Sequence, residues 1–214
     1  MPKSYSLSEF ESKELLRSYG IKITKDAIVN SADEAIEQSE IIGYPVVLKI
    51  SGAEFSHKTE LNGVKLNLGN ETSVRDAVAD LYKSVDGQTP LLISEQVKSS
   101  REFIAGVTRN DEYGLVLAFG AGGIFTEIIK DVVFRLLPAS REEIRSMFDE
   151  LLNKEIFGEV RGEPEVNFEK LAKTLAALGD CAMDREDILS IDVNPLLIND
   201  GVPVAVDALV ELYE

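Results

Sequence analysis

The segment Val46–Ile50 constrains the fold most, because it is a short run of apolar, largely β-branched residues, interrupted by one lysine, that follows a break at Gly43-Tyr44-Pro45. Such a run is typical of a buried strand. A helical pattern over residues 31–42 precedes the break, and the alternating apolar and polar residues of Val64–Leu68 indicate a strand with one solvated face. These neighbouring helix and strand patterns predict a mixed α+β (α/β) fold.

Helix and strand patterns continue through the rest of the chain. Helices are also predicted over residues 7–19, 72–85, 141–152 and 168–183, and strands over residues 27–29, 91–97, 102–109, 114–119, 124–130, 132–137, 189–198 and 202–208. The last two strands form a hairpin around Asn199-Asp200-Gly201, because Asp-Gly favours hairpin turns. A boundary near Gln88 is predicted to divide the chain into an N-terminal β/α lobe, residues 1–88, and a sheet-rich C-terminal lobe, residues 89–214, with a ligand cleft between them.

The composition limits the classes of function. Of the 214 residues, 44% are hydrophobic and 28% are charged, as is typical of a globular protein, and the net charge of −16 argues against binding to nucleic acid, which requires a basic surface. No apolar run reaches the roughly 18 residues that a membrane-spanning helix needs, and the first residues lack the apolar core of a signal peptide. The single cysteine, Cys181, excludes an internal disulfide. We therefore expect a cytoplasmic protein that binds neither nucleic acid nor membrane.

The only histidine of the chain, His57, lies in a polar loop between the strands Val46–Ile50 and Val64–Leu68. A neutral imidazole is a nucleophile near neutral pH, and the neighbouring lysines, Lys49 and Lys58, suit a phosphate. Two alternatives stay open at this point: a histidine without a chemical role, and a Lys49 ammonium that reaches solvent through its flexible stem.

The cluster Gly120-Ala121-Gly122-Gly123 offers backbone N–H groups that a ligand or phosphate can approach closely. It fits neither a Walker A motif nor the dinucleotide fingerprint, and an ordinary turn is the alternative. Downstream, Glu127, Asp131 and Arg135 follow one another at intervals of four residues in a strand pattern and are predicted to share a face. They form either a network around a phosphorylated group or a surface ladder of ion pairs.

Polar residues interrupt the final apolar strands. Asp192 and Asn194 lie two residues apart, and therefore on the same face of their strand, and the hairpin brings Asp207 close to Asn194. Carboxylate and amide oxygens suit Mg²⁺, which takes its remaining ligands from phosphate oxygens and water. Polar residues at strand ends without any ligand are the alternative. Acidic side chains within apolar strands conflict with the local pattern, however, and such conflicts favour a functional site.

Five motifs in one order identify a resemblance that extends from about Leu7 to Leu212. The chain resembles the ATP-grasp subunit of the ADP-forming acyl-CoA (acetyl-CoA) synthetases, which are related to succinyl-CoA synthetase. The motifs are Gly43-Tyr44-Pro45-Val46-Val47-Leu48-Lys49, Ser56-His57-Lys58, Gly63-Val64-Lys65-Leu66, Gly122-Gly123-Ile124-Phe125-Thr126-Glu127 with Lys130-Asp131-Val132-Val133-Phe134-Arg135, and Asp192-Val193-Asn194-Pro195-Leu196.

The resemblance implies an ATP-grasp fold, in which two lobes hold a nucleotide between them, and the reaction acyl-CoA + ADP + phosphate ⇌ acid + CoA + ATP. In this family a partner subunit binds CoA and forms an acyl phosphate, whose phosphoryl group passes to a histidine of that subunit. The group then moves to a second histidine on the ATP-grasp subunit, and finally to ADP. His57 matches the second histidine. The chain shows no CoA-binding Rossmann-type domain, so a separate CoA-binding alpha subunit in an α2β2 heterotetramer is expected.

The resemblance also implies roles for individual residues. Lys49 matches the lysine that contacts the nucleotide phosphates, and Lys58 is a candidate donor to the phosphorylated histidine. Asn194 and Asp207 match the Mg²⁺ ligands, with Asp192 close by. The implied adenine hinge and a neighbouring nucleotide contact are Glu95, Gln96, Val97 and Glu102, and the implied supports of the phosphate loop are Gly122, Gly123, Glu127 and Arg135.

Two other functions stay open at the level of the sequence. An ATP-grasp ligase that activates a carboxylate for amide formation needs no phosphorylated histidine, so His57 argues against it. A non-catalytic regulatory or assembly module is disfavoured, because His57 is present together with Lys49 and both expected metal ligands. The expected cofactors are Mg²⁺ and ATP or ADP.

Overall fold

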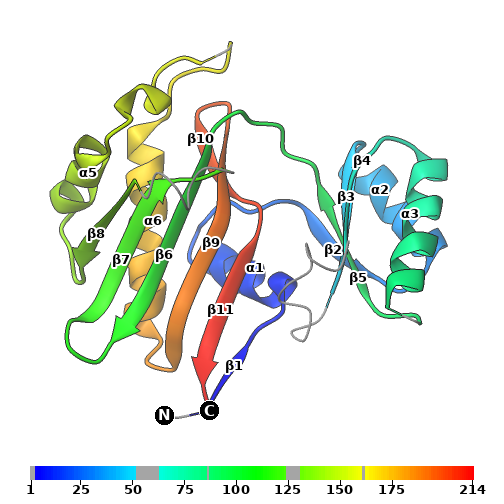
Figure 1. Ribbon diagram of the computed structural model, residues 1–214, viewed down its shortest axis with the longest axis horizontal. Coiled ribbons are helices and arrows are strands. Elements are labelled where there is room, and N and C mark those ends of the chain that lie inside the picture. The colour runs from blue at the N-terminus through cyan, green and yellow to red at the C-terminus, as the bar shows by residue number, and fades with distance from the viewer. Residues whose placement is uncertain (1–2, 52–62, 86, 124–130, 161) are drawn as a thin grey trace. The chain divides into compact units, whose positions relative to one another are not determined.

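The computed structural model describes residues 3–51, 63–85, 87–123, 131–160 and 162–214. Within these residues the chain forms two compact units (Figure 1). The smaller unit comprises Ser8–Phe10 and Thr24–Val97, and the larger unit comprises Met1–Leu7, Glu11–Ile23 and Lys98–Glu214. None of the helices in the described part of the chain is long and apolar enough to cross a membrane.

The smaller unit is a four-stranded antiparallel sheet with two helices on one side (Figure 1). Its elements are β2 (Asp26–Val29), α2 (Ala32–Ile42), β3 (Val46–Ile50), β4 (Val64–Leu68), α3 (Glu71–Ser84) and β5 (Leu91–Glu95). The strand order is β2-β5-β3-β4, which places β5 and β3 at the centre of the sheet. The helix α2 contacts β2 and β5, α3 contacts β3 and β4, and the two helices contact each other.

Capping residues define where the helices of the smaller unit begin. The Ser31 hydroxyl accepts a hydrogen bond from the Glu34 N–H at 3.1 Å, and the Asn70 side chain accepts one from the Ser73 N–H at 2.9 Å. These caps satisfy N–H groups that have no partner within the first turn of a helix. The core beneath the helices includes Val74, Ala77, Val78 and Leu81 of α3 and Val46, Leu48 and Ile50 of β3.

The larger unit is a seven-stranded sheet with helices packed on it (Figure 1). Its strands are β1 (Ser4–Ser6), β6 (Glu102–Asn110), β7 (Gly114–Ala121), β8 (Val132–Leu136), β9 (Ile188–Asn199), β10 (Val202–Ala205) and β11 (Ala208–Tyr213). They are ordered β1-β11-β9-β6-β7-β8, and β10 pairs with the second half of β9. The helical segments are α1 (Glu9–Ser18), α5 (Arg141–Glu150), the 3-10 turn η2 (Lys154–Phe157) and α6 (Phe168–Asp184). The helix α6 contacts β6, β7, β9 and β10, whereas α5 contacts α6 and β8.

The large sheet has one covered and one open face. Along β6 the buried Phe103, Ala105 and Val107 alternate with half-exposed residues, because successive side chains of a strand point to opposite faces. On the covered face, five phenylalanine rings have neighbouring centroids 5.2 to 5.7 Å apart: Phe103, Phe119, Phe148, Phe157 and Phe168. We call the other side, with Glu102, Ile104 and Gly106 of β6 and Asp192 and Asn194 of β9, the open face.

The structure confirms most of the predicted elements. The predicted helices over residues 31–42, 72–85, 141–152 and 168–183 agree with α2, α3, α5 and α6 to within two residues at each end. The prediction of one strand over residues 202–208 is wrong, because β10 ends at Ala205 and β11 begins at Ala208, where β9 exchanges one partner for the other. Neither β1 nor the rest of β11 was predicted. The predicted strand over residues 124–130 lies outside the described residues.

The boundaries of the two compact units differ from the predicted boundary at residue 88. The strand β5 is hydrogen-bonded between β2 and β3, so the smaller unit continues to Val97. Most of α1 belongs to the larger unit instead, where the Ser12 hydroxyl accepts a hydrogen bond from the Val210 N–H at 3.1 Å. Both differences arise from pairings between residues that are distant in the sequence.

Candidate functional site

Lys49 lies on β3, where strands on both sides fix its backbone opposite Leu92 and Val64. Its Nζ lies 2.6 Å from Oε1 of Glu9, and the two side chains are only 7% and 3% exposed. Two charges can be buried in this way because each compensates the other. The structure therefore places the Lys49 ammonium in a buried ion pair, and not in solvent as the flexible-stem alternative required.

The predicted adenine hinge is fixed by hydrogen bonds within the smaller unit. The Glu95 N–H donates to the Lys25 carbonyl at 2.9 Å, and the Glu95 carboxylate accepts from the Lys25 N–H at 3.2 Å. The Gln96 N–H donates to the Pro45 carbonyl at 3.2 Å. The backbone that follows β5 is thereby held in place up to the half-buried Val97.

The Gln96 side chain joins the hinge to the end of β4. Its Oε1 accepts a hydrogen bond from the Asn67 N–H at 2.6 Å, and its Nε2 donates to Oδ1 of Asn67 at 2.8 Å. Asn67 has a φ of 60°, in the left-handed region that asparagine tolerates better than most residues. The Gln96 amide is therefore engaged with β4, another strand of its own sheet.

The predicted phosphate loop and the predicted nucleotide contact Glu102 lie together at the end of β7. The Gly122 N–H donates to the Glu102 carbonyl at 2.7 Å, and a Cβ on Gly122 would lie 2.9 Å from the carbonyl carbon of Glu102. Gly123 has a φ of +92°, which L side chains rarely adopt. Gly122 is glycine because the Glu102 backbone lies too close for a side chain, and Gly123 is glycine because its backbone is left-handed.

Asn194 and Asp207 meet where β9 passes from β11 to β10. The Asn194 N–H donates to the Asp207 carbonyl at 3.2 Å, and the Val206 N–H donates to the Pro195 carbonyl at 3.1 Å. Asp192 lies two residues before Asn194 on the same face of β9. The structure thus brings the three predicted metal-ligating residues to one region of the large sheet.

The electrostatics of this region fit a divalent cation. Asp192 is exposed, but the strands around it remove part of its water, and this desolvation together with the negative charge of Asp207 raises its pKa. Two carboxylates that repel each other, with Asn194 in the same region of the sheet, form a donor set that suits Mg²⁺. The described part of the chain has no cluster of three or more His, Cys, Asp or Glu side chains that could hold a metal ion. A cation here would therefore complete its coordination with ligand oxygens and water.

A cavity of about 230 Å³ opens on the sheet beside Asp192. Two of the residues that line it are small: Gly106 and Ala118 lie opposite each other on adjacent strands. The lining includes Ile104, Gly106, Thr108, Ala118, Ser190 and Asp192. The sequence therefore leaves space for a ligand next to a candidate metal site.

The buried face of α1 is polar. Its buried residues are Glu9, Ser12, Lys13 and Leu16. The Lys13 side chain is wholly buried, and its ammonium donates to the Val206 carbonyl at 3.1 Å. Because Val206 precedes Asp207, this bond fixes the turn that presents a candidate metal ligand. The spacing of the apolar residues in α1 did not predict this face. The signal in the sequence is the spacing of its polar residues, because Ser12 and Lys13 follow Glu9 by three and four residues and therefore lie on the same side of the helix.

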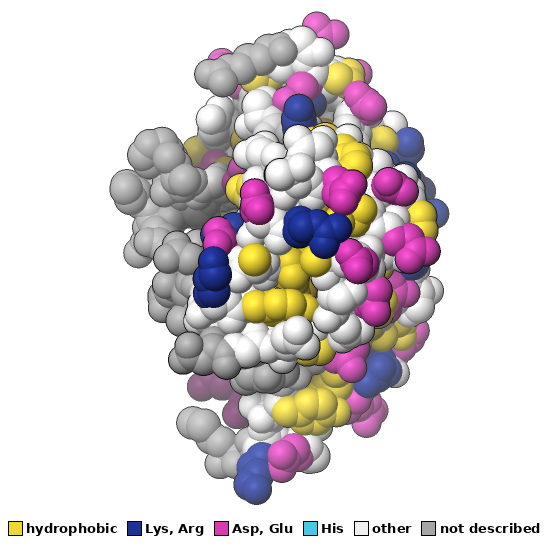
Figure 2. Space-filling view, turned by 90° about the vertical axis from the view of Figure 1, so that its right-hand side faces the viewer, with side chains coloured by type: hydrophobic (Ala, Val, Ile, Leu, Met, Phe, Trp, Pro, Cys, Tyr) yellow, Lys and Arg dark blue, Asp and Glu magenta, His cyan; other side chains and the backbone are white. Residues whose placement is uncertain are grey.

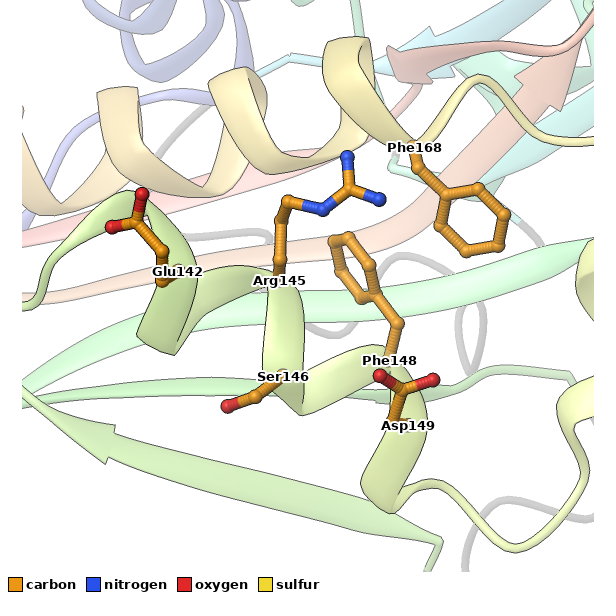
Figure 3. Close-up of a pocket in the computed structure, with 6 residues that line it drawn as sticks. All are labelled: Glu142, Arg145, Ser146, Phe148, Asp149 and Phe168. Carbon is orange, nitrogen blue, oxygen red and sulfur yellow. The ribbon is translucent and has the colours of Figure 1, made fainter.

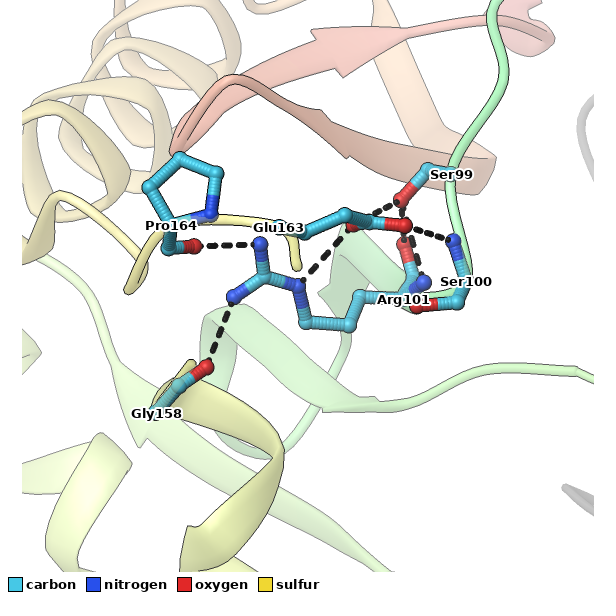
Figure 4. Close-up of polar contacts among 6 residues, drawn as sticks. All are labelled: Ser99, Ser100, Arg101, Gly158, Glu163 and Pro164. Atoms are coloured by element: carbon cyan, nitrogen blue, oxygen red, sulfur yellow. Dashed lines mark hydrogen bonds and ion pairs between the residues drawn. The ribbon is translucent and has the colours of Figure 1, made fainter. Parts of the chain in front are cut away.

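A buried arginine fixes the segment that leads into Glu102. Arg101, which the sequence patterns did not single out, is 1% exposed, and its guanidinium donates to the Gly158 and Pro164 carbonyls at 3.1 and 2.6 Å (Figure 4). It also lies 3.4 Å from the Glu163 carboxylate. Burial acts to raise the pKa of Glu163, but hydrogen bonds from Ser100 and the charge of Arg101 outweigh it and lower this pKa.

Arg135 and Asp131 contact different parts of the larger unit. The Arg135 guanidinium pairs with the Glu150 carboxylate of α5 and donates to the Ser146 hydroxyl at 2.9 Å. The Asp131 carboxylate accepts a hydrogen bond from the Leu152 N–H at 2.9 Å. These contacts favour the ion-pair alternative for Arg135 over a network around a phosphorylated group. Three predicted site residues lie outside the described residues: His57, Lys58 and Glu127.

A second hollow, of about 400 Å³, lies beside α5 and the start of α6 and contains none of the predicted site residues (Figure 3). The Arg145 guanidinium lies 5.9 Å from the ring centroid of Phe168 and pairs with the Glu169 carboxylate. Both contacts join α5 to α6. The residues that line this hollow are therefore explained by the packing of the two helices.

Comparisons with known proteins agree with the observed fold. The ATP-grasp domain family matches residues 2–212. The beta subunit of acetate–CoA ligase [ADP-forming] I from Pyrococcus furiosus is 36% identical over 208 residues, which cover 94% of this chain and 90% of that protein.

Two solved structures from Ca. Korarchaeum cryptofilum, both of a dinucleotide forming acetyl-coenzyme A synthetase 1, are also similar. The complex with coenzyme A, Ca-AMPCP and HgCl+ has a TM-score of 0.92 at 33% identity and covers 97% of this chain and 93% of that chain. The complex with coenzyme A and Mg-AMPPCP, with its phosphohistidine segment pointing towards the nucleotide binding site, has a TM-score of 0.86 at 33% identity with the same coverage. The predicted fold is confirmed: the chain belongs to the ATP-grasp family and is a relative of the beta subunits of ADP-forming acetate–CoA ligases.

Proposed function

We propose that this chain is the nucleotide-binding part of an ADP-forming acyl-CoA synthetase, as a beta subunit or the equivalent domain of a fused enzyme. The net reaction is acyl-CoA + ADP + phosphate ⇌ acid + CoA + ATP. One observation supports this most directly: Asp192, Asn194 and Asp207 converge on one region of the large sheet. The fold of the chain matches that of an acetyl-CoA synthetase over 97% of its residues. The ADP-forming ligase activity of the Pyrococcus furiosus relative supports the same reaction class.

The proposal assigns roles to the predicted nucleotide-binding and metal-binding residues. Lys49 contacts the phosphates, and the backbone of residues 95–97 contacts the base. Asn194 and Asp207 would hold Mg²⁺, with Asp192 close by. The metal, when bound, neutralises charge on the phosphate oxygens, which is the main requirement of phosphoryl transfer. The similar structure with Mg-AMPPCP supports this assignment.

The glycine loop and Glu102 complete the proposed nucleotide contacts. Gly122 and Gly123 leave no side chain between the loop and a phosphate, and the hydrogen bond from the Gly122 N–H to the Glu102 carbonyl holds the backbone of Glu102 beside the loop. Arg135 is assigned to the packing of α5 and not to phosphate, because its guanidinium pairs with Glu150.

We assign the chemical step to His57. A nitrogen of its neutral imidazole attacks the phosphorus of a phosphohistidine on the partner subunit, and a new N–P bond forms as the old one breaks. A terminal phosphate oxygen of ADP then attacks the same phosphorus, the bond to His57 breaks, and ATP and the free imidazole are released. Lys58 donates hydrogen bonds to the phosphoryl oxygens between the two steps. The phosphohistidine segment of the Korarchaeum structure supports such a relay.

The acyl half-reaction belongs to a partner in this proposal. The partner is a CoA-binding alpha subunit, joined to this chain in a cytoplasmic α2β2 heterotetramer. The beta-subunit name of the Pyrococcus relative and the coenzyme A bound to the similar structures support a partner of this kind. Without it, the chain is expected to form no acyl-CoA.

The proposal is tested with γ-labelled ATP and Mg²⁺. The purified chain is expected to acquire acid-labile, base-stable label, and His57→Asn is expected to acquire none while it still binds ADP in calorimetry. If the wild-type chain alone stays unlabelled, the assay is repeated with the CoA-binding partner. Equal label in the wild type and His57→Asn, or unchanged enzyme activity of that variant with the partner, would exclude the relay.

A further inference from the structure

The ion pair between Lys49 and Glu9 is a feature that the proposed function does not use. Both side chains are almost wholly buried, and their charged atoms lie 2.6 Å apart. Both residues belong to the smaller unit, which includes Ser8–Phe10 as well as Thr24–Val97. A buried acidic side chain directly beside the candidate phosphate-binding ammonium requires an explanation.

The two charged groups of this ion pair differ in how much freedom their side chains have. The Lys49 backbone is fixed by pairing with β5 and β4, but its charge stands at the end of four rotatable bonds. Glu9 has a shorter side chain and is the first residue of α1, where the helix dipole favours a negative charge. The Glu9 carboxylate therefore limits where the more flexible ammonium can lie.

An ammonium has three N–H donors, so an ion pair with one carboxylate oxygen is compatible with contacts to phosphate oxygens. From this geometry we propose that Glu9 is a positioning residue, which holds the Lys49 ammonium in the orientation that contacts the nucleotide phosphates. This inference rests on the proposed function, because it requires that Lys49 binds phosphate. Glu9 itself touches neither the nucleotide nor the reacting atoms in this role.

The first test compares Glu9→Gln with Glu14→Gln, a substitution of the same chemistry on the same helix at a carboxylate that pairs with Arg17. Calorimetry measures binding of ADP with Mg²⁺ and of adenosine. We expect Glu9→Gln to weaken ADP binding by about tenfold and to leave adenosine binding unchanged, because only the phosphates contact Lys49. Glu14→Gln is expected to match the wild type for both ligands, and Glu9→Asp to restore part of the ADP affinity. Unchanged or tighter ADP binding by Glu9→Gln would overturn the inference.

A double-mutant cycle with Lys49→Met separates positioning from a general effect on the fold. If Glu9 acts through Lys49, Glu9→Gln is expected to cause no further loss of ADP affinity in the Lys49→Met background. Additive losses would contradict the inference. The doubly substituted chain contains neither buried charge, so it remains measurable if Glu9→Gln alone fails to fold. Failure of the proposed function has a different signature, because the wild-type chain would then not bind ADP at all.

Discussion

The backbone around Asp207 is fixed from two sides. Its carbonyl accepts a hydrogen bond from Asn194 on β9, and the carbonyl of the preceding Val206 accepts one from the buried Lys13 ammonium. The carboxylate is therefore presented by a rigid turn between two strands. A metal ligand requires such support, because small displacements of the donor atom change coordination geometry.

We expect Asp207→Asn to weaken the Mg²⁺-dependent part of ADP binding by roughly tenfold or more, because the substitution removes a negative ligand and keeps the size of the side chain. ADP titrations in Mg²⁺ and in EDTA measure this part. Asp200→Asn is the matched control: the residue is exposed, and asparagine tolerates its φ of 49°. Equal losses in the two variants, or a loss that persists in EDTA, would contradict a metal role for Asp207.

At the scale of elements, the open face depends on the close approach of β6 and β9. Gly106 lies opposite Asp192, and a Cβ at this position would lie 2.5 Å from the Ile191 carbonyl oxygen. Since that atom belongs to the backbone, a side chain here must displace one strand relative to the other. The same glycine lines the cavity beside Asp192. A substitution of Gly106 is therefore expected to change both the stability of the sheet and the geometry of this cavity.

Gly106→Ala is expected to lower the free energy of unfolding by about 1–3 kcal/mol, the range typical of overpacking, because the added Cβ must displace the backbone of β9. Urea unfolding followed by circular dichroism measures the change. Gly69→Ala provides the control, because Gly69 is exposed and no atom lies within 4 Å of the Cβ that this substitution adds. A stability of Gly106→Ala equal to that of Gly69→Ala would mean that β6 and β9 separate at little cost.

Helices and their apolar buried faces were predictable from the sequence, and polar buried contacts were not. The spacing of Val74, Ala77 and Leu81 identified α3 and its core face, because burial of apolar side chains generates a period of 3.6 residues. The helix α1 was also predicted, but its buried Glu9 and Lys13 were not, because periodicity in apolar residues does not report a buried polar contact.

The candidate site shows the same division. Asp192, Asn194 and Asp207 were predictable as a group, because alternation along one strand and a nearby Asp-Gly hairpin are local signals. Arg101 was not predictable, since its partners Gly158 and Pro164 lie far along the chain and nothing local distinguishes a buried arginine from a solvated one. Asp131 and Arg135 were grouped by their spacing, but the structure gives them separate partners around α5.

At the scale of the whole molecule, negative charge is in large excess. The chain contains 38 Asp and Glu residues against 22 Lys and Arg residues. Figure 2 shows acidic side chains spread over the face in view, with basic side chains between them. Some are paired, as Arg75 is with Asp33 and Glu71, but exposed ion pairs contribute about 0–1 kcal/mol each. Repulsion among the remaining carboxylates therefore opposes the folded state.

We expect the melting temperature to rise when NaCl is increased from about 10 mM to about 300 mM, because the Debye length falls from about 30 Å to below 10 Å and repulsion is screened. Thermal scans by circular dichroism measure this.

Glu40 is exposed near the C-terminal end of α2, where the helix dipole also favours a cation. At low salt the melting temperatures are therefore expected to increase from the wild type to Glu40→Gln to Glu40→Lys. The differences should shrink at high salt, because screening removes the term that the substitutions change. A melting temperature that falls with salt would instead mean that attractive ion pairs outweigh the net charge of −16.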